Sequence, residues 1–130
     1  MKKHFRPLVS LVLLAPLASV GCGGAIREGN AYRDDTAKLI TAQANPKIHD
    51  CFDSMVKSTP GPTSLAGKTT VHFVVAKETG LITNPTVVPD GTTAQPPVAQ
   101  CVVTALNGMK LEPPDNVDGD ATFTWEFVVQ

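Results

Sequence analysis

The chain has 130 residues, of which 42% are apolar and 5% aromatic, with 11 basic and 12 acidic side chains and three cysteines. This length fits a single domain, and the apolar fraction excludes a wholly disordered chain. The balanced charge excludes the basic surface that binding to phosphates requires, so we expect no nucleic-acid partner.

The N-terminal residues have the features of a secretory signal. Basic residues within the first six positions precede an apolar run from Leu8 to Val20. This run is shorter than the ~20 residues that span a bilayer, and proline interrupts it. We therefore predict a signal peptide over residues 1–21.

The end of the apolar run resembles the lipobox of bacterial lipoproteins, because Cys22 directly follows Gly21, although Ser19 stands where leucine is usual. The resemblance implies that Cys22 becomes the acylated first residue of the mature chain, with residues 22–28 as a tether. Gly23 in place of aspartate favours the outer membrane, facing the periplasm. The alternative is an ordinary secretory signal. The mature chain keeps 8 basic and 12 acidic side chains, so its membrane attachment must come from acyl chains rather than a polybasic patch.

Two helices are expected before the first strand. Residues 29–44 have a thin apolar stripe of helical spacing. Asn45 and Pro46 have the residue types of a helix N-cap and first turn, so a second helix is predicted over residues 46–57. Its apolar stripe recurs at helical spacing and comprises Ile48, Cys51, Phe52, Met55 and Val56.

The remaining elements are strands and one more helix. Residues 68–76 and 81–88 read as a hairpin, in which Pro85 places the second strand at a sheet edge. A helix is predicted over 96–107, and residues 120–130 alternate as a strand with one aromatic face. We expect an α+β domain over residues 29–130, with its core in 46–130. Its three-stranded antiparallel sheet has the last strand beside the first, and two to three helices pack on one face.

Cys51 and Cys101 form an even pair once Cys22 is set aside, and an exported protein meets an oxidising compartment, so a disulfide is predicted. The alternative is a metal site that uses these cysteines with His49 and His72, although no CxxC spacing supports it.

The sequence contains no nucleophile motif, phosphate loop or zinc-protease motif, so we expect neither enzymatic activity nor a cofactor. Asp115, Asp118 and Asp120 surround a glycine, and their oxygens are of the type that calcium prefers. Their spacing departs from the alternating calcium loop. Aspartate and glycine are also usual in a turn that enters a strand, so they remain weak metal candidates.

The order of these elements resembles the C-terminal domain of the TonB superfamily, most closely the AgmX/PglI type of myxobacterial gliding and envelope proteins. The resemblance spans about three-quarters of the mature chain. It is carried by Ile48, Cys51, Gly67, Val71–Val75, Gly80–Ile82, Val98, Cys101, Val102, Leu111, Pro113, Pro114 and Phe123–Phe127.

The resemblance implies a domain that binds other envelope proteins, often through an exposed sheet edge. Residues 81–88 and 120–129 are the candidate edges, and the solvent-facing side chains of the second are Thr122, Thr124, Glu126 and Val128. The chain shows neither the inner-membrane helix nor the Pro-rich arm of an energy transducer, so the domain is expected close to its membrane. We therefore expect a protein-protein interaction module, of the kind found in a gliding-motility or trans-envelope assembly. One alternative is a periplasmic sensor or carrier that binds a small ligand or calcium, and another is a structural lipoprotein with no dedicated partner.

Overall fold

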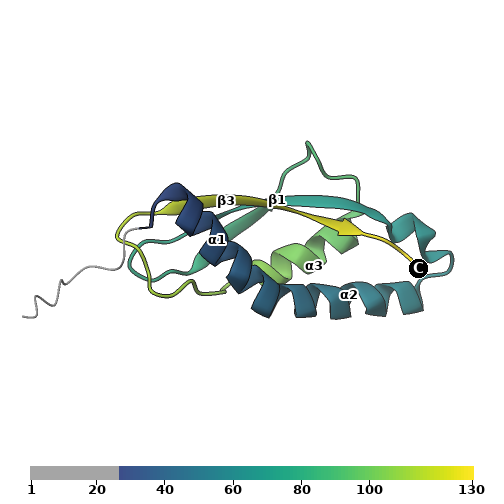
Figure 1. The fold of residues 1–130 in the computed structure, drawn as a ribbon. Helices are drawn as coiled ribbons and strands as arrows, with labels where there is room; N and C mark the ends of the chain where they lie inside the picture. The colour runs from purple at the N-terminus through teal and green to yellow at the C-terminus, as the bar shows by residue number, and fades with distance from the viewer. Residues whose placement is uncertain (1–26) are drawn as a thin grey trace, which may run out of the picture.

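A computed structural model describes residues 27–130, so the predicted signal peptide and Cys22 lie outside the described residues. Its fold confirms the α+β prediction. Three antiparallel strands lie in the order β2-β1-β3, and helices cover one face of this sheet (Figure 1). The strands are β1 (Gly67–Val75), β2 (Ile82–Val87) and β3 (Gly119–Phe127). The helices are α1 (Gly29–Leu39), α2 (Asn45–Ser58) and α3 (Pro96–Leu106), with a short 3₁₀ helix η2 (Pro62–Leu65). Within residues 27–130, no helix combines the length and the hydropathy that crossing a bilayer requires.

The boundary predicted at Asn45 is wrong, because α1 and α2 form one continuous helix. A π-helical segment, η1 (Ile40–Ala44), joins them, and the Asn45 N–H donates to the Ile40 carbonyl. Asn45 has helical dihedral angles, φ −55° and ψ −43°, and its side chain makes no cap hydrogen bond. Pro46 has no N–H, and its ring would meet the carbonyl four residues earlier in a regular α-helix. The wider π turn accommodates this proline, and the helix axis changes direction here (Figure 1).

The core lies between the sheet and the helices. On β1, Val71, Phe73 and Val75 alternate toward the helices and are at most 2% exposed. They pack against the apolar stripes of the helices and against the inner face of β3. Period-two strands and period-3.6 helices thus bury their apolar faces in one shared layer, as the sequence pattern predicts.

The hairpin turn between β1 and β2 depends on Gly80. Its φ of +70° lies in the left-handed region, and a Cβ atom there would overlap the carbonyl oxygen of Leu111. The same close approach allows the Leu111 N–H to donate to the Gly80 carbonyl at 2.8 Å. Glycine is therefore required where the segment after α3 crosses the hairpin.

Candidate functional site

The backbone groups of Thr70, on the central strand, point toward β2 and the loop that follows it. The Val88 N–H donates to the Thr70 carbonyl at 2.8 Å, and the Thr70 N–H donates to the Thr92 hydroxyl at 3.0 Å. Successive residues of a strand direct their backbone groups to opposite sides. Thr69 and Val71 therefore form the hydrogen bonds to β3.

This alternation defines a free edge on β3. Trp125 and Phe123 lie in register with Thr69 and Val71, so they bond to β1. Thr122, Thr124 and Glu126 lie between and beside these two residues. Their N–H and C=O groups therefore point away from β1, toward the open side of the strand. In the part of the chain that the structure describes, no backbone hydrogen bond outside the sheet reaches these three residues. An extended segment of another chain can pair with them as a fourth strand.

The other sheet edge, on β2, is partly covered. The Ile82 N–H donates to the Met109 carbonyl at 2.7 Å, and the Gly108 N–H donates to the Ile82 carbonyl at 3.2 Å. Pro85 lies in the middle of β2 and has no N–H to offer. Of the two edges that the sequence left open, β3 therefore has the longer unpaired backbone.

Three of the predicted partner-binding side chains, Thr122, Thr124 and Glu126, lie along this edge on the face of the sheet opposite the helices. The Thr124 hydroxyl lies 2.8 Å from that of Thr70, and the Thr122 hydroxyl lies 3.1 Å from the His72 ring. Glu126 is exposed, and Val128 is 65% exposed just beyond the end of β3. The structure thus places all four beside the free backbone.

A groove lies on the other side of the same edge, between α2 and the C-terminal end of β3. It encloses about 510 Å³. Ile48, Phe52 and Phe127 give it apolar walls, and His49 and Asp53 line it from α2. Sequence reasoning assigned the apolar residues to the core, and the structure shows that they also line an opening. The alternation of side chains along β3 predicts which of them face the helices. It does not predict whether α2 covers them completely.

A second groove follows the first half of β3. It encloses about 410 Å³ between the start of α1 and residues 117–123. The Tyr32 ring packs where Gly119 has no side chain, and a Cβ atom at that position would overlap the ring. The free edge of β3 therefore has a groove beside each half.

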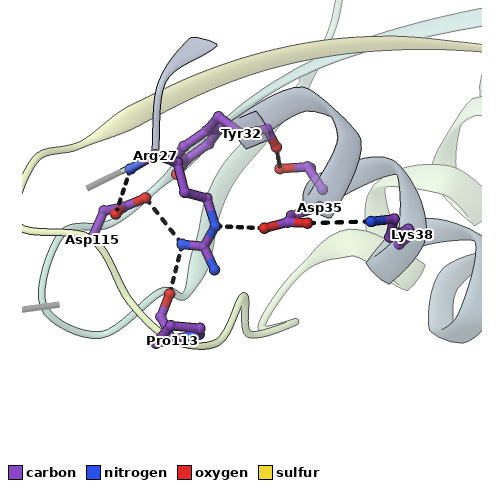
Figure 2. Close-up of polar contacts among 7 residues, drawn as sticks. Arg27, Tyr32, Asp35, Lys38, Pro113 and Asp115 are labelled. Atoms are coloured by element: carbon purple, nitrogen blue, oxygen red, sulfur yellow. Dashed lines mark hydrogen bonds and ion pairs between the residues drawn. The ribbon is translucent and has the colours of Figure 1, made fainter. Parts of the chain in front are cut away.

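Arg27 joins the start of the described chain to the segment before β3, as Figure 2 shows. Its Nε donates to Asp35 at 2.8 Å, and its Nη1 donates to the Pro113 carbonyl at 2.7 Å and to Asp115 at 3.0 Å. The Arg27 N–H also donates to Asp115 at 3.1 Å. The side chains of Arg27 and Asp115 are 7% and 2% exposed. We call these four residues the Arg27 clasp.

The clasp shifts the pKa values of nearby groups. Burial lowers the pKa of Arg27, but its hydrogen bonds to Asp35 and Asp115 outweigh this effect, so the net pKa is raised. The hydrogen bond from Arg27 lowers the pKa of Asp35. Burial raises the pKa of Tyr32, and the negative charge of Asp115 adds to the effect. The guanidinium is thus held charged. Arg27, inside the predicted tether of residues 22–28, is bonded to the domain.

The three weak calcium candidates have separate roles. Asp115 belongs to the clasp, Asp118 accepts a hydrogen bond from the Lys77 N–H at 2.8 Å, and Asp120 lies 3.3 Å from His72. Within residues 27–130, no group of three or more histidine, cysteine or acidic side chains is placed to hold a metal ion.

The structure contains the disulfide between Cys51 and Cys101, which links α2 to α3 across a Cα–Cα distance of 5.9 Å. The cysteines of the alternative metal site are therefore bonded to each other. Its histidines lie apart, with His49 beside Asp53 on α2 and His72 on the outer face of the sheet. Cys22, the predicted lipidation site, lies outside the described residues.

Comparison of the chain with protein-family models, with curated proteins and with solved structures finds no match.

Proposed function

We propose that this chain is a non-enzymatic, lipid-anchored protein of the cell envelope whose domain binds an extended segment of another envelope protein along β3. One observation carries the proposal. The outward backbone groups of Thr122, Thr124 and Glu126 have no partner outside the sheet within residues 27–130, and grooves lie beside them. Pairing with a fourth strand satisfies these groups, and the grooves receive alternate side chains of the added strand.

The side chains around the edge suggest the chemistry of the bound segment. Every second residue of an added strand faces the groove side, where Phe52, Trp125 and Phe127 favour apolar side chains. The residues between them lie on the outer face, beside the exposed carboxylates of Asp120 and Glu126. Opposite charges on neighbouring strands are favourable. The best fit is therefore an extended segment in which apolar residues alternate with polar or basic ones.

The location in the envelope rests on the sequence around Cys22, and the type of assembly rests on the resemblance to AgmX/PglI C-terminal domains. Acylation at Cys22 would attach the domain to the outer membrane on its periplasmic side. A partner in a gliding-motility or trans-envelope assembly would then meet the β3 edge from the periplasm.

Site-specific photo-crosslinking in the producing organism tests the proposal. A photoreactive residue at Val128 captures whatever occupies the edge, and mass spectrometry identifies the captured segment. Thr124→Pro removes an outward N–H from β3. Thr124→Val is the matched control, because it loses the same hydroxyl bond to Thr70 but keeps the N–H. Melting curves of both variants establish that they fold.

We expect capture of one dominant envelope protein, lost in Thr124→Pro and kept in Thr124→Val. A synthetic peptide of the captured segment should then bind the purified domain. The same peptide, methylated on the backbone nitrogens of alternate residues, should not bind. Equal capture by the folded proline and valine variants would show that strand addition is not the binding mode.

A further inference from the structure

We propose that the Arg27 end of the domain rests directly on the lipid bilayer, with Val117 and Leu81 in contact with it, while the groove at the C-terminal end of β3 faces away from the membrane. This inference rests on the proposed acylation of Cys22. It adds a second interaction surface, whose partner is the lipid itself, and an orientation for the first surface.

The length of chain between the predicted anchor and the clasp sets the distance. Only residues 23–26 separate Cys22 from Arg27. Even a fully extended chain advances at most ~3.6 Å per residue, so the Arg27 Cα lies within about 18 Å of the Cys22 Cα. Arg27 is itself held to the domain by four hydrogen bonds to Asp35, Pro113 and Asp115. The end of the domain that contains the clasp must therefore lie near the headgroups.

Two further segments belong to the same end of the molecule. The Glu78 N–H donates to the Asp115 carbonyl at 2.7 Å, and the Lys77 N–H donates to the Asp118 carboxylate at 2.8 Å. The hairpin turn after β1 and the segment before β3 are thus tied to the clasp. Together with Arg27, residues 77–81 and 111–118 form what we call the Arg27 end.

The distribution of exposed apolar side chains supports contact with lipid. Among residues 27–130, three large apolar side chains are exposed: Val117 at 56%, Leu81 at 38% and Val128 at 65%. The first two lie at the Arg27 end, where part of each side chain faces solvent in the described chain. Val128 lies at the opposite end of β3, beside the proposed docking edge. The free energy falls when exposed apolar side chains of this kind leave water and enter the interface of a bilayer.

The charges at this end are mixed, which indicates what kind of lipid surface fits. Lys77 lies in the same turn as Glu78, and Glu112 lies 2.9 Å from Lys110, which is just outside this end. A net attraction to anionic headgroups is therefore not expected. Contact should depend on the acyl anchor and the apolar side chains, and neutral phosphatidylcholine should support it.

The course of β3 sets the orientation of the groove. The strand begins at Gly119, two residues after Val117, and ends at Phe127. Eight steps of ~3.3 Å separate these ends by about 26 Å. Figure 1 shows the C terminus at the end of the molecule opposite the start of α1. A domain resting on its Arg27 end holds the groove beside Phe127 toward the periplasm, where a partner can reach it.

Depth-dependent fluorescence quenching tests this orientation with the full mature chain in vesicles of phosphatidylcholine brominated in the acyl chains. Trp125 is the only tryptophan, and its fluorescence reports on the C-terminal half of β3. A second protein carries Val117→Trp and Trp125→Phe, and it reports on the Arg27 end. The tryptophan at position 117 should lose on the order of half of its emission relative to unbrominated vesicles, since interfacial residues lie within ~5–10 Å of the acyl boundary. Trp125 should lose almost none.

Mass spectrometry of the N-terminal peptide first establishes that Cys22 is acylated. In that acylated protein, equal quenching at the two positions would overturn the orientation and leave the docking edge intact. An unmodified Cys22 would instead overturn the proposed anchor, and this inference with it. Arg27→Gln in the Val117→Trp protein provides a further check. It releases the clasp, so quenching at position 117 should fall toward the Trp125 level while near-ultraviolet spectra show that the domain remains folded.

Discussion

The indole Nε1 of Trp125 donates a hydrogen bond to the Asn45 side-chain oxygen at 3.0 Å. This bond joins the C-terminal half of β3 to the residue at which the π-helical segment meets α2. The side chain that the sequence suggested as a helix cap instead holds the long helix to the edge strand. The position of the groove between α2 and β3 therefore depends on where the π segment ends.

Removing the Asn45 acceptor tests this relationship. Asn45→Ala should shift Trp125 emission to longer wavelength, because the indole loses its partner and gains access to water. It should lower the free energy of unfolding by about 1 kcal/mol, the usual net value of such a bond. Gln43→Ala, an exposed change in the π segment, is the control. If Asn45 acted as a helix cap, its replacement would lower helicity by circular dichroism and leave Trp125 emission unchanged.

Hydrogen exchange should reveal the alternation along β3. The amides of Phe123 and Trp125 are bonded to β1, so they should exchange orders of magnitude more slowly than those of Thr122, Thr124 and Glu126. Two-dimensional NMR of the purified domain in deuterated buffer measures each amide separately. Uniform protection along the strand would mean that the edge is already covered, for instance by a second copy. Dilution would distinguish that case, because a dimer dissociates at low protein concentration and the protection by a second copy is then lost.

The fold was largely predictable from sequence, because it follows from local periodicity. The alternation of residues 120–130 and the helical spacing around Cys51 and Cys101 each identify a face that must be buried. The continuous helix through Asn45 and Pro46 was not predictable from residue types, which fit a cap equally well. The Asn45 N–H bond to the Ile40 carbonyl and the tertiary contact between Asn45 and Trp125 distinguish the continuous helix from a capped one.

The Arg27 clasp left no trace in the sequence pattern. Arg27 and Asp115 are 88 residues apart, and the adjacent opposite charges of Arg27 and Glu28 beside a glycine-rich stretch have the composition of a tether. Asp115 likewise sits among residues that favour a turn. Neither residue belongs to a periodic pattern or a sequence motif. Their ion pair is therefore recognisable only in the folded structure, where the two segments lie together.

The disulfide should supply a large share of the stability. It closes a loop with a sequence separation of 50 residues, which is worth about 4 kcal/mol in the chain-entropy model. Cys51→Ala combined with Cys101→Ala should lower the free energy of unfolding by about this amount in urea titrations. The far-ultraviolet spectrum should be retained, since both helices also pack on the apolar core. A loss below about 1 kcal/mol would mean that the unfolded chain keeps these helices together without the bond.

Calcium should leave the domain unchanged. Asp115, Asp118 and Asp120 already interact with Arg27, the Lys77 N–H and His72, and they do not converge. A melting curve of chelator-treated protein should therefore not move when millimolar calcium is added. A rise of several degrees that disappears in Asp118→Asn would instead favour the calcium-binding alternative.

Tyr32 reports on the clasp through its ionisation, and it is the only tyrosine in the chain. Burial and the charge of Asp115 raise its pKa above the ordinary value near 10, so the near-ultraviolet absorbance of tyrosinate should appear at higher pH in the folded protein than in urea. Because the folded pKa is the higher one, this group's contribution to stability is complete below about pH 10 and is lost as the pH rises through the folded pKa.

Substitutions near Tyr32 test the cause of its shift. Asp115→Asn should lower the pKa, because it removes a negative charge and leaves the positive charge of Arg27 nearby. Asp118→Asn also removes a negative charge that raises the Tyr32 pKa, but it leaves the clasp in place. Its effect should have the same sign and be smaller, since the charge of Asp118 contributes less than that of Asp115. An unchanged titration in both folded variants would mean that the charges of Asp115 and Asp118 do not act on the Tyr32 ring.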